Sequence, residues 1–131
     1  MPTLTPTLTL TSTDITSDEL NFSVTDSLTV TAPSQSLSTV VATATGSATV
    51  IIPAATGTRY LFIRHTGTTD GSTGTSQDVD IEDEDDNTMI RLGPGEWAFF
   101  PVSVSEASKA IQLQVDHASV VQLEYAYWTK G

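Results

Sequence analysis

The chain has 131 residues, of which 38% are apolar, and its 16 acidic and 5 basic residues give a net charge of −11. This length fits one domain around one core, and no stretch approaches the ~20 apolar residues of a membrane-spanning helix. So acidic a chain does not bind nucleic acid by neutralising phosphates, and the absence of cysteine excludes disulfides, thiol catalysis and Cys-ligated zinc. We therefore expect neither nucleic acid nor a membrane among its partners.

The N-terminal segment has a composition of its own. Residues 1–19 alternate leucine with threonine, and Pro2 and Pro6 exclude a central strand because proline has no N–H to donate to a ladder. One interpretation is a mobile terminus, and the other is an arm that orders by adding a strand to a neighbouring subunit. We divide the chain into an extended Thr-rich N-terminal arm at 1–19 and a β-sandwich domain at 20–131.

Residues that favour extended backbone dominate the chain. Its 23 Thr and 14 Ser, together with Val, favour strands, and alternation at period two recurs while an apolar 3.6-residue repeat does not. Turn residues separate the alternating segments, including a turn expected at 32–34. The expected strands are Asn21–Thr31, Ser38–Thr45, Ser47–Ile52, Thr58–His65, Gln77–Asp83, Thr88–Leu92, Glu96–Val104, Ala110–Val115 and Val120–Trp128. This spacing predicts an all-β fold, a single antiparallel β-sandwich that is jelly-roll-like.

An acidic hairpin is predicted from Gln77 to Leu92. The cross-strand pairs that a two-residue loop at Asp85-Asp86 creates are Val79 with Leu92, Ile81 with Ile90 and Asp80 with Arg91. One face of this hairpin is aliphatic and the other places opposite charges across the ladder. Such pairs contribute roughly 0.2–1 kcal/mol each, so the pattern favours this register.

Half of the acids lie within 17 positions, from Asp70 to Asp86. Calcium binds clustered oxygen ligands, but the glycine of an EF-hand loop is missing, because that position counted from Asp78 is Asp83. Alternate acids in a strand point from one face in a row and do not surround a point, so we expect a solvated strand face and hairpin tip. Such charge also protects a sheet edge from unwanted strand pairing. Asp83, Asp85 and Asp86 are a weak candidate for a divalent-cation site, and recognition of a basic partner is a further alternative.

No catalytic motif supports an enzyme. His65 and His117 lack metal-ligand spacing, no serine lies in a G-x-S-x-G motif, and the glycine-rich loop has no Walker lysine. We expect no catalytic residue, no cofactor and no enzymatic activity. A small hydrolase with a carboxylate pair is a minor alternative, since any two acids can approach in a fold. The polar loop 66–76 is expected to be an exposed, mobile excursion.

The segment Met89–Val102, which ends in an aromatic strand, is the most individual part of the sequence. In Glu96–Val104, Trp97 and Phe99 share one strand face, and the other face is also apolar. Such a strand lies at the centre of a sandwich, or has one core face and one subunit interface in an assembly. Aromatic residues are enriched at interfaces. The candidate interface residues are Leu4, Leu8, Leu10, Trp97, Phe99, Tyr127 and Trp128.

Three segments around the acidic hairpin together resemble a known class of proteins. They are Tyr60–Thr66, Leu92-Gly93-Pro94-Gly95-Glu96-Trp97-Ala98-Phe99-Phe100-Pro101, and Leu123-Glu124-Tyr125. Over about residues 45–127 the chain resembles small virion structural proteins of tailed bacteriophages, notably head decoration or cement proteins. In that class an L-x-P-G-E-x-x-x-x-P segment lies in a β-sandwich and the last strand often ends in L-E-Y.

The resemblance implies a non-enzymatic, self-associating virion protein that is made in the host cytoplasm and binds the major capsid protein. We expect a symmetric homo-oligomer, such as a trimer, on the outer capsid surface, where each copy bridges capsid subunits and stabilises the shell. The alternative is a tail or head fibre module that recognises cell-surface glycans through loop aromatics and a cation at Asp83–Asp86.

Overall fold

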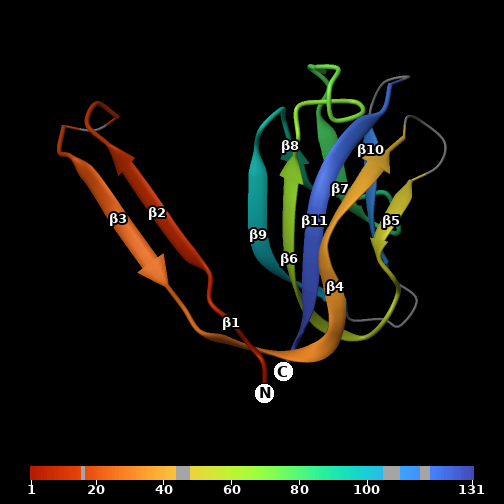
Figure 1. Ribbon diagram of the computed structural model, residues 1–131, viewed down its shortest axis with the longest axis horizontal. Helices are drawn as coiled ribbons and strands as arrows, with labels where there is room; N and C mark the ends of the chain where they lie inside the picture. The colour runs from red at the N-terminus through yellow and green to blue at the C-terminus, as the bar shows by residue number, and fades with distance from the viewer. Residues whose placement is uncertain (16, 44–47, 105–109, 116–118) are drawn as a thin grey trace.

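A computed structural model describes residues 1–15, 17–43, 48–104, 110–115 and 119–131 (Figure 1). These residues form eleven β-strands and no helix, which confirms the all-β prediction. All strand pairs are antiparallel. The strands are β1 Thr3–Leu4, β2 Thr7–Ser12, β3 Leu20–Thr25, β4 Leu28–Ala42, β5 Thr49–Ile52, β6 Gly57–His65, β7 Val79–Asp83, β8 Thr88–Leu92, β9 Trp97–Val104, β10 Ile111–Val115 and β11 Val121–Lys130. Within these ranges no helix is long and apolar enough to cross a membrane.

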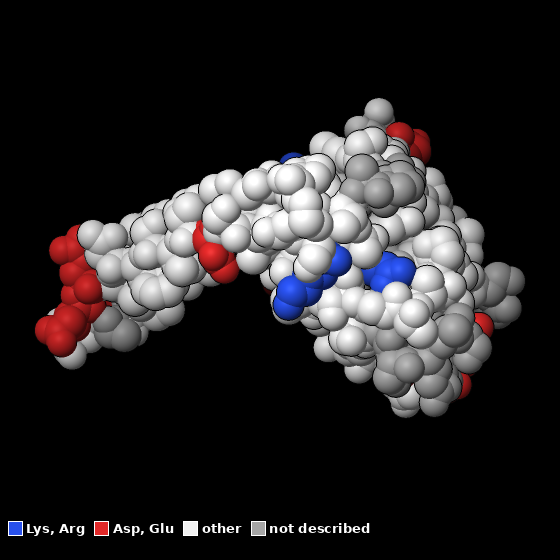
Figure 2. All heavy atoms as spheres, turned by 90° about the horizontal axis from the view of Figure 1, so that it is seen from below, with Lys and Arg blue, Asp and Glu red and all other residues white. Residues whose placement is uncertain are grey.

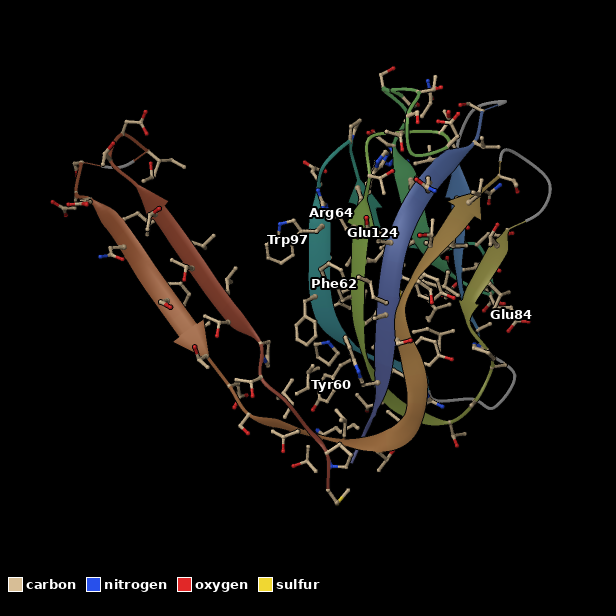
Figure 3. The ribbon with its side chains drawn as sticks, viewed as in Figure 1. Tyr60, Phe62, Arg64, Glu84, Trp97 and Glu124 are labelled. Atoms are coloured by element: carbon tan, nitrogen blue, oxygen red, sulfur yellow. The ribbon has the colours of Figure 1, made fainter. Side chains whose placement is uncertain are left out.

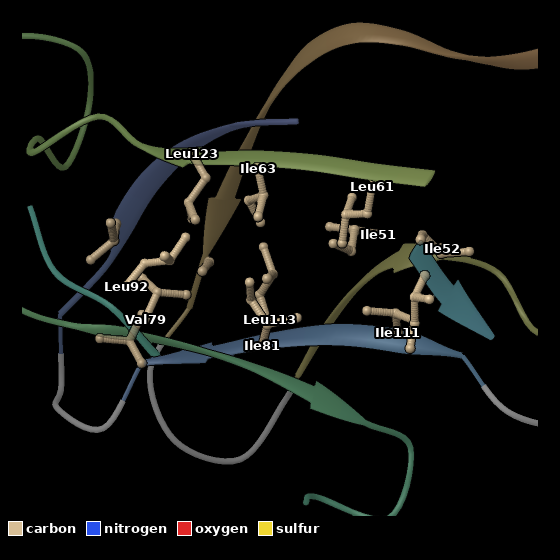
Figure 4. Packing of buried hydrophobic residues seen from close by; sticks show 14 residues of the cluster. Ile51, Ile52, Leu61, Ile63, Val79, Ile81, Leu92, Ile111, Leu113 and Leu123 are labelled. Carbon is tan, nitrogen blue, oxygen red and sulfur yellow. The ribbon is translucent and has the colours of Figure 1, made fainter. Parts of the chain in front are cut away.

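The body of the protein consists of two sheets with an apolar cluster between them. One sheet has five strands in the order β1-β4-β11-β6-β9, and the other has four in the order β5-β10-β7-β8. Figure 4 shows side chains from both sheets meeting in the space between the strands. The buried members of the cluster are Ala42, Ile51, Ile52, Leu61, Ile63, Val79, Ile81, Leu92, Val102, Ile111, Leu113, Val115, Val121 and Leu123. Removing these side chains from water is the main driving force that holds the sheets together.

Alternation along each strand decides which residues enter this core. In β11, Val121 and Leu123 are fully buried, whereas Gln122 and Glu124 are only partly buried. Successive side chains of a strand point to opposite faces, so the second pair lies on the outer surface of the five-stranded sheet. Because β11 pairs with both β4 and β6, its backbone is hydrogen-bonded on both sides.

Strand β4 corrects one expectation from the sequence. It runs without interruption from Leu28 to Ala42, where the sequence predicted a turn at 32–34. Its register against β11 shifts twice in the segment that faces Tyr125–Thr129. Irregular pairing of this kind accommodates Pro33, which has no N–H to give to a regular ladder.

The hairpin of β7 and β8 confirms the predicted register and corrects the predicted turn. The observed pairs include Val79 with Leu92, Asp80 with Arg91 and Ile81 with Ile90. The loop has three residues, not two, because Asp86 adopts the left-handed conformation with φ of 62° and its N–H donates to the Asp83 carbonyl at 3.2 Å. A register shift between Ile81 and Glu82 then restores the pairing beyond the loop.

Two acids of this hairpin are buried, although the sequence predicted a solvated strand face. Asp80 is 4% exposed and Glu82 is 6% exposed. Arg91 offsets the desolvation of Asp80 by donating two hydrogen bonds to its carboxylate, from Nε at 2.6 Å and from Nη2 at 2.9 Å. On the next strand, Gln112 lies opposite Glu82 and donates to Asp86 at 2.9 Å. The outer surface of the four-stranded sheet is therefore polar and hydrogen-bonded within itself.

Replacement of Arg91 by Ala is expected to lower the free energy of unfolding by about 1–3 kcal/mol, because it leaves the Asp80 carboxylate buried without its guanidinium donors. Urea unfolding followed by circular dichroism measures this loss. The control is Arg64→Ala, which removes an exposed guanidinium from the other sheet and is expected to change stability by no more than about 0.5 kcal/mol. Equal effects of the two substitutions would contradict the structural role of the Asp80 pair.

The loop 66–76 is exposed at residues 70–74, as its composition suggested, and hydrogen bonds connect it to the rest of the fold. Within the loop, the N–H of Thr69 donates to the carbonyl of Thr73 at 2.8 Å. At its base, the N–H of Gln122 donates to the carbonyl of Thr68 at 2.8 Å, which connects the loop to β11. The loop is therefore a folded extension of the five-stranded sheet.

Asp70 caps this loop and gives it a pH dependence. The N–H groups of Thr73 and Ser72 donate to its carboxylate at 2.7 and 2.9 Å and hold the pKa of Asp70 below its ordinary value of 3.8. A lowered pKa means that the cap is complete above pH 3.8 and is lost as the pH falls through the lower, folded-state value. We expect the amide proton shifts of Ser72 and Thr73 to titrate with a midpoint below 3.8 in NMR spectra. Asp70→Asn should abolish this titration, and its persistence would contradict the assignment.

Candidate functional site

Strands β2 and β3 form a two-stranded ribbon that projects from the body (Figure 1). β2 pairs with β3 along its whole length, and β1 pairs with the start of β4. The N–H of Asp26 donates to the carbonyl of Pro6 at 3.2 Å and joins the two ladders. The expected boundary between residues 19 and 20 falls at the tip of this ribbon, so β3 belongs to the projecting element and is not a strand of the two main sheets.

One face of the β2–β3 hairpin is apolar. We call Leu8, Leu10, Leu20, Phe22 and Val24 the apolar face, because the register places Leu8 opposite Val24 and Leu10 opposite Phe22 on the same side of the ribbon. Leu10, Phe22 and Val24 are 48, 47 and 48% exposed. A two-stranded hairpin is marginally stable in water by itself, so an apolar face this open is typical of an element that packs against a partner.

The opposite face of the hairpin carries hydroxyl groups. The hydroxyl oxygens of Thr7 and Thr25 lie 2.9 Å apart, and those of Thr9 and Ser23 lie 3.2 Å apart. These cross-strand hydrogen bonds stabilise the ladder without using the apolar face. The threonine and leucine alternation in the sequence therefore has two separate roles, one for each side of the ribbon.

The outer surface of the five-stranded sheet is aromatic along β6 and β9. We call Tyr60, Phe62, Trp97, Phe99 and Trp128 the aromatic face, since the pairing places Phe62 beside Phe99 and Tyr60 beside Trp128. The rings of Tyr60 and Phe99 are stacked with centroids 6.3 Å apart. Trp97 is 53% exposed and extends from the sheet toward the side on which the hairpin lies (Figure 3). This surface is the apolar counterpart of the polar outer surface of the four-stranded sheet.

An apolar groove separates the base of the hairpin from the aromatic face. Its volume is about 240 Å³, and its lining comes from both sides: Pro6, Thr7, Leu8, Val24, Asp26, Trp97 and Phe99. The apolar face of the hairpin is thus directed toward the aromatic face at the base of the ribbon. A second, more open hollow of about 460 Å³ lies over the same sheet and is lined by Phe62, Arg64, Gly95 and Trp97.

Charge is distributed unevenly around this groove. Figure 2 shows acidic side chains at the far end of the projecting hairpin and basic side chains on the body. The tip carries Asp14, Asp18 and Glu19, all of them exposed. The five-stranded sheet carries Arg64 on β6 and Lys130 on β11, which are both exposed. A chain with a net charge of −11 therefore places exposed basic residues on the sheet that also bears the aromatic face.

The structure brings some of the predicted interface residues together and separates others. Leu8, Trp97 and Phe99 line one groove, and Leu10 continues the same face toward the tip. Leu4 is half-buried in β1, where it pairs with β4. Tyr127 packs against the core cluster, on the inner side of β11, whereas Trp128 is half-buried on the outer side.

Sequence reasoning missed the β3 half of the apolar face, Leu20, Phe22 and Val24, although these residues alternate at the same period as β2.

The sequence left two alternatives for strand β9, a strand at the centre of a sandwich or a strand with one core face and one subunit interface. The strand lies at the edge of the five-stranded sheet and is not central. Ala98 and Phe100 pack toward the core cluster, while Trp97 and Phe99 face outward. One face of β9 therefore packs on the core and the other is directed outward.

The acidic hairpin offers little room for a cation among its turn residues. The Asp83 carboxylate accepts hydrogen bonds from the N–H of Asp85 at 2.9 Å and of Asn87 at 3.0 Å, and Asp86 accepts one from Gln112. Across the part of the chain that the structure describes, no group of three or more His, Cys, Asp or Glu side chains is arranged to hold a metal ion. The carboxylates of this turn act as hydrogen-bond acceptors that shape the loop.

The two histidines differ in what the structure shows of them. His65 is fully buried, its Nε2 lies 2.8 Å from the carbonyl of Gln77, and its Nδ1 accepts the N–H of Gly67 at 2.9 Å. An accepting Nδ1 places the proton of the neutral ring on Nε2, which donates to Gln77. His117 lies outside the described residues. His65 thus has a structural position beneath the loop 66–76.

Comparison with known proteins gives no relative: no family model, curated protein or solved structure matches the chain. The candidate functional site therefore stands on its geometry. It comprises the apolar face of the hairpin, the aromatic face of the sheet and the groove between them.

Proposed function

We propose that this protein is a structural, non-enzymatic virion component, a capsid decoration or cement protein of a tailed bacteriophage. In this role it binds the major capsid protein on the outer surface of the shell and bridges adjacent subunits. The copies self-associate as a symmetric oligomer, such as a trimer. The observation that carries the proposal is the projecting hairpin with its open apolar face.

The geometry supports a bridging role. Strands β2 and β3 have six residues each, so the hairpin reaches about 20 Å beyond its base at ~3.3 Å per residue. Its apolar face and Trp97 of the aromatic face are exposed to a second protein, whereas Phe62, Phe99 and Trp128 are half-buried and Tyr60 is buried. Burying apolar area on two sides of one subunit joins its neighbours, and this opposes forces that pull a shell apart.

We propose a division of roles between the two parts of the fold. A single jelly-roll-like sandwich would serve as the rigid body, and the N-terminal ribbon would serve as its arm. The two packed sheets and the pairing of β1 with β4, which attaches the ribbon to the body, support this division of roles.

The test uses capsid shells that lack the protein. Purified protein is expected to sediment with these shells in a saturable ratio and to raise the temperature at which they lose integrity. Electron cryomicroscopy of the decorated shells should then show its density on the outer surface. Protein that stays in the supernatant at all ratios, with shells equally stable in its absence, would overturn the proposal.

The second candidate is a fibre module that binds cell-surface glycans. The hollow lined by Phe62, Arg64, Gly95 and Trp97 favours it, because aromatic rings stack against the apolar face of a sugar while a guanidinium donates to its hydroxyls. A glycan array in the presence and absence of calcium tests this function. Binding that is lost in Trp97→Ala supports it, and an array without any bound glycan rejects it.

A further inference from the structure

The body of the protein leaves most of the apolar face of the hairpin uncovered. The register of β2 with β3 continues without a shift into that of β1 with β4, and the Asp26–Pro6 hydrogen bond lies where the two meet. On the body side of this junction, the N–H of Val30 donates to the carbonyl of Pro2 at 3.0 Å. These bonds make the hairpin a direct continuation of the β1–β4 ladder. Its apolar side chains beyond the base therefore stay uncovered in a single chain.

The aromatic face is likewise incompletely covered by the rest of its own chain. Trp97 is 53% exposed, and only the base of the hairpin, at Leu8 and Val24, approaches it. Beyond the base, strands β2 and β3 run away from β9 (Figure 1). Each chain thus carries two apolar surfaces of similar character that its own fold leaves apart.

Charge indicates that the partner of the hairpin is another copy of the same sheet. The tip bears three acids, and the outer face of the five-stranded sheet bears Arg64, whose cross-strand partner on β11 is Glu124, and Lys130 further along β11. This face is among the few basic regions of a chain with only five basic residues. A hairpin laid along the sheet of a second copy brings its acidic tip toward basic side chains while its apolar residues meet the aromatic face.

We propose that the β2–β3 hairpin of one copy docks its apolar face onto the aromatic face of a second copy. This exchange repeats between identical subunits and closes into a symmetric oligomer. The inference rests on the proposed docking role and deepens it by naming the partner of the hairpin. It does not require a capsid, so it can succeed or fail independently of the virion assignment.

The test measures self-association of the full chain by sedimentation equilibrium. We expect the wild type to form one discrete oligomer, and Phe22→Thr on the hairpin or Trp97→Ser on the sheet to weaken association at least tenfold. Both residues are about half exposed, so the folded subunit should keep its melting temperature. The matched control is Asn21→Thr, which changes the neighbouring residue on the hydroxyl-bearing side of the same strand.

Mixing the two variants gives the decisive result. Phe22→Thr retains an intact aromatic face and Trp97→Ser retains an intact hairpin, so an equimolar mixture is expected to form heterodimers that neither variant forms alone. Glu19→Lys at the tip, made alone in an otherwise wild-type chain, should weaken association several-fold at low salt and less at high salt. A wild type that stays monomeric, or an oligomer that Phe22→Thr leaves intact, would overturn the inference. An oligomer that does not bind shells would overturn only the capsid role.

Discussion

Leu123→Ala is expected to lower the free energy of unfolding by about 2–5 kcal/mol, which is a large part of the stability of a domain of this size. Leu123 is fully buried in β11, the strand that joins β4 to β6. Its truncation removes apolar contacts at the centre of the core cluster and leaves a cavity that the two sheets cannot easily close. Chemical unfolding followed by tryptophan fluorescence measures the loss.

The control for this substitution is Leu37→Ala. It removes the same atoms from a leucine that is 63% exposed on β4, so we expect a change of no more than about 0.5 kcal/mol. A similar loss for both variants would mean that the core is not centred on β11.

His65→Leu is expected to cost about 2–4 kcal/mol, although it replaces a polar residue in the interior by an apolar one of similar size. The imidazole uses both ring nitrogens, and without it the N–H of Gly67 and the carbonyl of Gln77 lose their partners. Unpaired buried backbone groups carry the full cost of desolvation. Thermal unfolding of the variant gives the loss of stability, and hydrogen exchange should show faster exchange at the Gly67 amide.

His65→Gln provides the comparison. A glutamine amide both donates and accepts, so it can replace at least one of the two hydrogen bonds and should lose less stability than leucine. If leucine were tolerated better than glutamine, the hydrogen bonds of His65 would not be what holds the loop 66–76.

Local patterns in the sequence predict the strands well, because alternation reflects burial directly. The register of β7 with β8 follows from Val79, Asp80 and Ile81, since any slip by one residue moves the aliphatic side chains to the wrong face. The turn type could not be predicted, because it depends on Asp86 entering the left-handed region, which asparagine and aspartate tolerate but do not require. Pro33 suggested a turn because proline interrupts a regular ladder. The sequence around it does not indicate that β11 pairs irregularly at that point.

The partners of a strand are harder to predict than the strand itself. The segment Leu20–Thr25 alternates as a strand of the body would. Alternation alone therefore does not identify β2 as its partner. The burial of Asp80 and Glu82 has a similar cause, because it comes from Arg91 and Gln112 on adjacent strands. Thus the apolar residues of the candidate site were visible in the sequence, but their assembly into a hairpin face and a sheet face required the three-dimensional structure.

The places of β2, β3 and β11 in the chain determine the order in which the hairpin face and the aromatic face arise during synthesis. The hairpin needs only the first 30 residues and can form within ~1–10 μs of their release from the ribosome. The aromatic face is complete only once Trp128 is in place, and at ~5–20 residues per second this takes on the order of 5–20 s longer. Under the proposed docking, a nascent chain therefore carries the hairpin face before it carries the completed aromatic face, so two unfinished chains lack the complete pair of surfaces.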